Sequence, residues 1–201
     1  MIKKEYIPNI LTSLRILLIP VFIFYMLSSK YLIALICFFI ASITDWADGH
    51  FARKFDVVSR FGTFWDPLAD KLLILSAFYS FLQIDILSGT IHVWMISIIL
   101  FRDISITLLR VIINLKGNIV LVTSKIAKLK TLLQIITIIW ILSSLTFLEI
   151  WELDIISPNI LEQLLNMSYF LALSTTFLTL YTGLHYYYNN VGKLIHALSN
   201  K

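Results

Sequence analysis

The chain has 201 residues, of which 59% are apolar and only 14% are charged. Soluble domains contain roughly 45–50% apolar and about 25% charged residues, so this composition excludes an ordinary soluble domain and indicates an integral membrane protein. Gly, Pro and Cys number six, four and one, which excludes a collagen-like chain, a disordered chain and a disulfide scaffold. The net charge is +4, and the few charged residues are unevenly distributed.

Six apolar segments approach the roughly 20 residues that an α-helix needs to cross a bilayer. In chain order they cover about residues 10–27, 31–47, 68–84, 91–113, 131–148 and 167–188. The residues around Pro8 are expected to form an interfacial helical turn that leads into the first span. The sequence therefore predicts a single all-α membrane domain over residues 1–201, with six transmembrane helices and an N-terminal interfacial helical segment.

The Lys and Arg residues predict the orientation of these spans. With six spans, eleven basic residues fall on the side of both termini, namely Lys3, Lys4, Arg53, Lys54, Arg60, Lys116, Lys125, Lys128, Lys130, Lys193 and Lys201. The opposite loops carry one basic residue, Lys30, and the acidic residues Asp85, Glu149, Glu152, Asp154 and Glu162. Because basic loops stay in the cytoplasm, both termini are predicted to be cytoplasmic.

Two aspartates follow the charge-free part of the second span. That part runs from Tyr31 to Thr44, which is 14 residues, and as a helix it covers about 21 Å. The hydrocarbon core is roughly 30 Å thick. The helix is therefore expected to continue through Asp45 and Asp48, which places both carboxylates near the cytoplasmic boundary.

The third span begins with a second pair of aspartates, Asp66 and Asp70. Thr63 is expected to cap the helix, and Pro67 to lie in its first turn, where its missing N–H has little effect. The segment between the pairs, residues 49–65, is expected to be a loop.

The spacing within each pair places its two carboxylates on one helix face. Asp45 and Asp48 are three residues apart, and Asp66 and Asp70 are four apart. Four converging carboxylates repel one another, and each costs about 2.5–3.5 kcal/mol at a helix centre. Such a cluster needs cations, and ligation by oxygen alone suits two divalent ions, Mg²⁺ or Mn²⁺. Two-metal sites commonly support displacement at phosphorus.

Other interpretations of the aspartates remain open at this point. They could cap helices or mark span ends in water. They could also belong to a divalent-cation or proton-coupled transporter, since intramembrane acids line ion pathways. The basic residues on the cytoplasmic side argue against a transporter, because they would repel cations.

The aspartate pattern resembles the signature of the CDP-alcohol phosphatidyltransferase family. The matching positions are Asp45, Asp48, Gly49, Ala52, Arg53, Gly62, Asp66 and Asp70. This resemblance implies a six-helix membrane enzyme, usually homodimeric, that displaces CMP from a CDP-linked lipid or alcohol through an acceptor hydroxyl.

Three further segments resemble the bacterial members that make phosphatidylglycerophosphate. They are residues 7–15 with Pro20 following, residues 102–110, and residues 124–131. Two positions depart from the family pattern: Asp103 replaces the usual Glu, and Ala127 replaces the usual Gly. The last third of the chain is similar mainly in hydropathy.

The resemblance also implies roles for individual residues. Metal ligands are Asp45, Asp48, Asp66 and Asp70, and Asp70 is in addition the general base. Gly49 and Ala52 would let a nucleotide lie against the helix, where Arg53 pairs with phosphate, and Gly62 is the loop residue that turns the chain back. The expected pocket for an acceptor phosphate comprises Arg110, Lys128 and Lys130.

Several of these roles compete with simpler ones. Gly49 and Ala52 could serve helix packing, Arg110 could reach the interface by snorkelling, and Lys128 and Lys130 could belong to the cytoplasmic basic band. Arg102 lies deeper in the fourth span and needs an anionic partner.

The function expected from the resemblance is phosphatidyl transfer from CDP-diacylglycerol to glycerol 3-phosphate. The products are phosphatidylglycerophosphate and CMP, and the enzyme is expected in the bacterial cytoplasmic membrane with its site facing the cytoplasm. A cardiolipin synthase, which uses phosphatidylglycerol as acceptor, shares the whole pattern. No nucleic-acid partner is expected.

Overall fold

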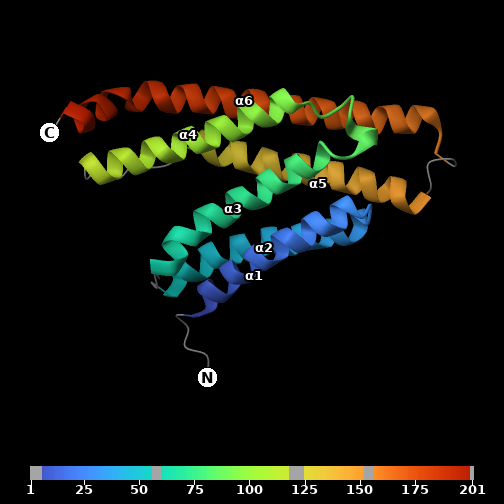
Figure 1. The fold of residues 1–201 in the computed structure, drawn as a ribbon, viewed down its shortest axis with the longest axis horizontal. Coiled ribbons are helices and arrows are strands. Elements are labelled where there is room, and N and C mark those ends of the chain that lie inside the picture. Colours follow the sequence, from blue (N-terminus) through green and yellow to red (C-terminus); the bar gives the residue numbers. More distant parts are fainter. Residues whose placement is uncertain (1–5, 56–59, 118–124, 152–155, 200–201) are drawn as a thin grey trace. The chain divides into compact units, whose positions relative to one another are not determined.

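The computed structural model describes residues 6–55, 60–117, 125–151 and 156–199, which form six α-helices and no strand. The elements are α1 (Tyr6–Leu27), α2 (Tyr31–Phe55), α3 (Arg60–Phe81), the short 3₁₀ turn η1 (Asp85–Leu87), α4 (Val93–Gly117), α5 (Lys125–Trp151) and α6 (Pro158–Ser199). Each helix overlaps one predicted apolar segment, so the all-α class is confirmed (Figure 1). The turn expected at Pro8 belongs to the start of α1.

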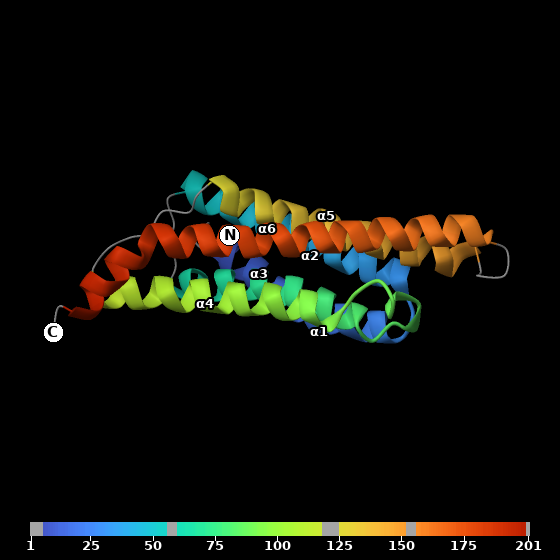
Figure 2. The same cartoon turned by 90° about the horizontal axis from the view of Figure 1, so that it is seen from above.

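The helices group into two compact units. Unit 1 comprises residues 1–88 and 138–165, and therefore contains α1, α2, α3, η1, the second half of α5 and the start of α6. Unit 2 comprises residues 89–137 and 166–201, with α4, the first half of α5 and most of α6. Within unit 1, α1 packs against both α2 and α3. Within unit 2, α4 runs beside α6 in both views (Figures 1 and 2).

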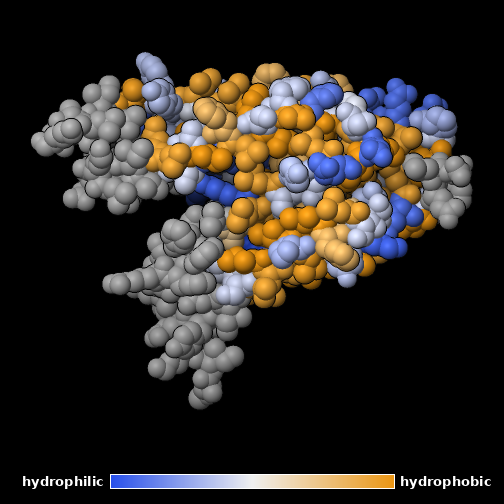
Figure 3. Space-filling view, in the orientation of Figure 1, coloured by the Kyte–Doolittle hydropathy of each residue, from blue (hydrophilic) through white to orange (hydrophobic). Residues whose placement is uncertain are grey.

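The helices bury hydroxyl groups and expose large apolar side chains. Thr137 and Thr175 are fully buried and their hydroxyls are 2.7 Å apart, whereas Phe101 is 77% and Leu17 is 66% exposed. Apolar side chains accordingly cover much of the face drawn in Figure 3. Polar contacts between helices and an apolar exterior are typical of helices that pack in lipid.

Two of the described helical segments are long and apolar enough to cross a membrane. They are Lys128–Trp151, with 24 residues, and Pro158–Gly192, with 35 residues. Shorter apolar stretches occur at Leu11–Leu27, Tyr31–Thr44 and Lys71–Phe81. Six spans with both termini in the cytoplasm stay a prediction.

The predicted loop over residues 49–65 is wrong, whereas the expected place of Gly49, Ala52 and Arg53 on the second helix is confirmed. α2 continues to Phe55 and α3 already begins at Arg60. Consequently Gly62 is helical, Thr63 is no N-cap, and Pro67 lies two turns into α3. The error came from treating Gly and Pro as helix boundaries. A helical Gly costs only about 1 kcal/mol, and membrane helices tolerate internal Pro because neighbouring groups satisfy the freed backbone atoms; α1 likewise contains Pro20.

The turn between α1 and α2 is closed by backbone bonds and by a distant side chain. Ser29 has a positive φ of 56°, and the N–H of Lys30 donates to the carbonyl of Tyr25 at 2.9 Å, which is a Schellman ending of α1. The carboxylate of Glu149, on α5, then accepts the N–H of Leu32 in the first turn of α2 at 2.9 Å. A side chain 117 residues away therefore caps α2.

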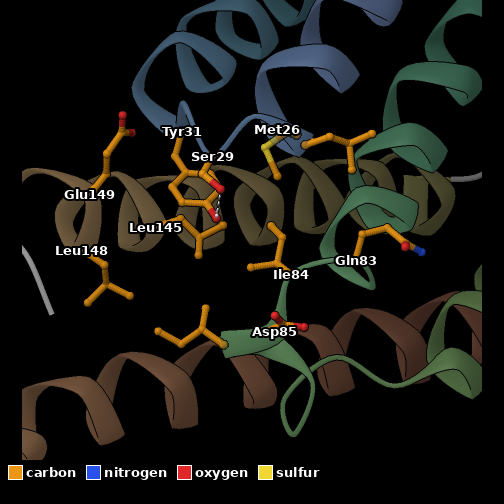
Figure 4. Close-up of a pocket in the computed structure, with 11 residues that line it drawn as sticks. Met26, Ser29, Tyr31, Gln83, Ile84, Asp85, Leu145, Leu148 and Glu149 are labelled. Carbon is orange, nitrogen blue, oxygen red and sulfur yellow. Dashed lines mark hydrogen bonds between the residues drawn. The ribbon is translucent and has the colours of Figure 1, made fainter.

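A cavity of about 380 Å³ lies beside this turn in unit 1. Its lining comes from the end of α1, the following turn, the start of α2, the segment from Gln83 through η1, and α5. It includes Met26, Tyr31, Gln83, Ile84, Asp85 and Leu145 (Figure 4). The walls are largely apolar, and the acidic residues Asp85 and Glu149 also line the cavity.

Replacing Glu149 by Ala should lower the free energy of unfolding by about 0.5–2 kcal/mol, because it removes the cap of α2. Thermal or denaturant unfolding of the purified protein in detergent measures the change. Glu162→Ala is the matched control, since Glu162 is an exposed acid near the start of α6. Equal loss of stability in both variants would contradict a capping role for Glu149.

Candidate active site

The four aspartates all lie on helices of unit 1. Asp45 and Asp48 lie in α2, so the expected continuation of that helix is confirmed, and Asp66 and Asp70 lie in α3. Because only residues 56–59 separate α2 from α3, both aspartate-bearing segments lie at the same end of the unit (Figure 1). Their side chains lie outside the described residues, so their convergence on one site stays a prediction.

The chemistry of this donor set fits a hard divalent cation. Four carboxylates supply only oxygen ligands, and their charge matches two divalent ions. Helical spacing of three and four residues lets both members of each pair face the same way. Among the side chains that the structure describes, no group of three or more His, Cys, Asp or Glu residues could hold a metal.

The predicted nucleotide-binding residues continue the helix beyond Asp48. Gly49, Ala52 and Arg53 all lie in the last two turns of α2. Their offsets from Asp45, which are four, seven and eight residues, place them on or near the same helix face. Their side-chain surroundings, and those of Arg110 in α4, lie outside the described part of the chain.

Unit 2 contains a buried cluster of three charged residues. The ammonium of Lys130, on α5, lies 2.6 and 2.7 Å from the two carboxylate oxygens of Asp103, on α4. The guanidinium of Arg102 donates to the same carboxylate at 3.0 Å. The side chains of Arg102, Asp103 and Lys130 are only 13%, 9% and 5% exposed. Asp103 is thus the anionic partner that Arg102 required.

α6 completes the surroundings of Arg102. The guanidinium of Arg102 donates a second bond to the hydroxyl of Thr182 at 3.2 Å, and that hydroxyl in turn donates to the carbonyl of Thr179 at 3.0 Å. Gly183 lies directly against the same side chain, since a Cβ there would be 2.7 Å from Cγ of Arg102. The last third of the chain therefore contributes to this cluster.

Lys128 and Lys130, both predicted to hold the acceptor phosphate, have different environments. Lys128 is exposed, whereas Lys130 is buried and paired with Asp103. Two residues apart on a helix, they point in nearly opposite directions. A pocket that uses both stays a prediction.

Four further residues of these helices have no role predicted from the sequence: Arg15, Asp103, Thr182 and Gly183. Arg15, on α1, is fully buried, and α1 packs against both aspartate-bearing helices. An acid or a base inside an apolar segment is itself a functional signal, so Asp103 and Arg15 could have been singled out. Thr182 and Gly183 carry no comparable signal.

Gly183→Ala should lower the free energy of unfolding by about 1–3 kcal/mol, because the added methyl group displaces the Arg102 side chain. Gly192→Ala is the matched control on the same helix, where a Cβ has no neighbour within 4 Å. This control should be neutral or stabilising by up to about 1 kcal/mol through helix propensity. Unfolding in detergent compares the two, and similar shifts in both would remove the close-contact argument.

Proteins of known name resemble this chain over most of its length. The Bacillus subtilis (strain 168) protein named CDP-diacylglycerol–glycerol-3-phosphate 3-phosphatidyltransferase is 37% identical over 147 residues, which are 66% of this chain and 74% of that protein. A protein of the same name from Blochmanniella floridana is 38% identical over 69% of this chain and 74% of its own. Another, from Shigella flexneri serotype 5b (strain 8401), is 32% identical over 189 residues, which are 90% of this chain and 92% of that protein. No solved structure matches the chain significantly.

The model of the CDP-alcohol phosphatidyltransferase family matches residues 5–186. This range includes every residue of the aspartate pattern as well as Arg102, Asp103 and Lys130. The chain therefore belongs to the CDP-alcohol phosphatidyltransferase family and is an enzyme of that type.

Proposed function

We propose that this enzyme transfers the phosphatidyl group of CDP-diacylglycerol to the 1-hydroxyl of glycerol 3-phosphate. The observation that carries the proposal is the complete pattern from Asp45 to Asp70 in a chain whose relatives are named for this reaction. The acceptor oxygen attacks the phosphorus that carries diacylglycerol, and the bond from that phosphorus to the CMP oxygen breaks. The products are phosphatidylglycerophosphate and CMP.

Asp70 is proposed to take the proton from the acceptor hydroxyl. A carboxylate serves as general base if it stays ionised and can approach the hydroxyl. Asp45, Asp48, Asp66 and Asp70 would hold two divalent ions, Mg²⁺ or Mn²⁺. When bound, these ions supply charge neutralisation for the pyrophosphate and the departing CMP. The remaining catalysis is positioning and electrostatic stabilisation by the chain itself.

The nucleotide is proposed to lie along the end of α2. Gly49 and Ala52 have small side chains, which allow close approach of a ligand to the helix. Arg53 follows on the adjoining face and can pair with phosphate in a bidentate manner. Gly62 lies in α3, and its lack of a side chain is proposed to allow the nucleotide to approach that helix closely as well.

Basic residues favour a phosphorylated acceptor over an uncharged alcohol. Arg110, Lys128 and Lys130 are proposed to attract the phosphate of glycerol 3-phosphate, and the Arg102 guanidinium supports them from within unit 2. Phosphatidylglycerol, the acceptor of a cardiolipin synthase, carries a phosphodiester with one negative charge instead. A phosphomonoester carries up to two, so a strongly basic pocket prefers it.

The enzyme is proposed to be a multi-pass protein of the bacterial cytoplasmic membrane that acts as a homodimer. Its relatives are bacterial, and its helices expose apolar side chains such as Phe101 and Leu17. An active site on the cytoplasmic side agrees with the eleven basic residues on that side. It also gives water-soluble glycerol 3-phosphate direct access.

Purified enzyme with Mg²⁺ and CDP-diacylglycerol should release CMP when glycerol 3-phosphate is added. A parallel reaction with phosphatidylglycerol should release far less, because this acceptor has the smaller charge. CMP is measured by chromatography, and the lipid product by mass spectrometry. No CMP release with glycerol 3-phosphate would overturn the acceptor assignment, and release with phosphatidylglycerol alone would indicate a cardiolipin synthase.

Asp70→Asn should lower kcat by about 10²–10⁴-fold, which is the usual contribution of a positioned general base. The unfolding temperature in detergent should change little, since Asn has the same shape. Asp85→Asn is the matched control, because Asp85 is an exposed acid in η1 of the same unit. Turnover by Asp70→Asn at the control rate would exclude the base role.

A further inference from the structure

We propose that Asp103 is a positioning residue that holds the Lys130 ammonium in place for the acceptor's phosphate. This inference rests on the proposed transfer to glycerol 3-phosphate. Both carboxylate oxygens of Asp103 lie within 2.7 Å of the ammonium nitrogen. A Lys side chain is long and flexible, so a two-oxygen contact that joins α5 to α4 removes most of its freedom.

Asp103 is itself held by its neighbours. Arg102 donates to one of its carboxylate oxygens at 3.0 Å and is tied to α6 through Thr182 at 3.2 Å. Gly183 leaves the space through which the Arg102 side chain passes. Contacts from α4, α5 and α6 therefore hold the ion pair together, and all the residues that fix the position of the Lys130 ammonium lie in unit 2.

The helix register supports this arrangement independently of the charged contacts. Thr137 on α5 meets Thr175 on α6 at 2.7 Å between hydroxyls. Seven residues back along α5 lies Lys130, and seven residues forward along α6 lies Thr182. Because the two helices run in opposite directions (Figure 1), these steps of two turns reach the same level. The register of α5 against α6 therefore brings Lys130 and Thr182 to the same level, where each contacts the Arg102–Asp103 pair of α4.

Charge and positioning predict opposite changes in the KM for glycerol 3-phosphate when the Asp103 carboxylate is removed. A carboxylate next to Lys130 weakens the attraction between the ammonium and a phosphate, so a neutral residue at position 103 should lower the KM for glycerol 3-phosphate if only charge matters. Loss of positioning instead raises that KM, because an unrestrained ammonium spends little time in the binding geometry. The sign of the change therefore discriminates between the two accounts.

The experiment measures kcat, both KM values and the unfolding temperature in detergent for four proteins besides the wild type. Asp103→Asn keeps the shape and removes the charge, and Asp103→Glu keeps the charge. The exchange Asp103→Lys with Lys130→Asp restores an ion pair but moves the ammonium to α4. Glu162→Gln, an exposed acid on α6, is the control for loss of one carboxylate.

Asp103→Asn should raise the KM for glycerol 3-phosphate about tenfold or more, while the KM for CDP-diacylglycerol stays near that of the wild type. Asp103→Glu should restore most of the affinity for the acceptor. The exchanged pair should recover the unfolding temperature but not the KM, because the ammonium now starts from the wrong helix. Glu162→Gln should match the wild type in every parameter.

Three results would overturn the inference. One is a lowered or unchanged KM for glycerol 3-phosphate in Asp103→Asn. Another is an equal rise in both KM values that follows the unfolding temperature, which indicates a structural pair only. The third is a normal KM in the exchanged pair.

If the exchanged pair does not fold, the contrast between Asp103→Asn and Asp103→Glu decides. Failure of the wild type to use glycerol 3-phosphate would instead refute the proposed function, and this inference with it.

Discussion

The need to satisfy polar groups without water governs this structure. An apolar medium offers no hydrogen bonds to a bare N–H, carbonyl or charge, so each must find a partner within the protein. The Glu149 carboxylate, 117 residues away in the chain, accepts the N–H of Leu32, which is one of the free donors in the first turn of α2. The hydroxyls of Thr137 and Thr175, both fully buried, likewise pair with each other at 2.7 Å.

Charge burial has the same consequence in unit 2. Arg102, Asp103 and Lys130 occupy largely enclosed positions, and each has at least one charged partner. Removing one member of a buried pair generally costs about 3–5 kcal/mol, because the other charge is left uncompensated. Such a cluster is weak evidence for net stability, but its contacts link α4, α5 and α6 at one level.

Helix number and helix position were predictable because both follow from local hydropathy. Six apolar segments became six helices, and the continuation of α2 through Asp45 and Asp48 followed from the length of a helix against the thickness of a bilayer. Helix ends were less predictable. A helical Gly costs only about 1 kcal/mol, and Pro is tolerated inside membrane helices, so neither residue reliably marks a helix end. Helix therefore occupies most of the loop expected at residues 49–65, up to Phe55 and again from Arg60.

The family and its type of reaction could be recognised without a structure, because the spacing of Asp45, Asp48, Asp66 and Asp70 is a local property of the chain. The pairing of the buried charges, in contrast, could not be predicted before the fold was known. The pairing of Asp103 with Lys130 and the bond from Arg102 to Thr182 join residues 27 and 80 positions apart. Such contacts depend on the register of one helix against another, and that register is set by packing along whole helix faces, which no short stretch of sequence encodes.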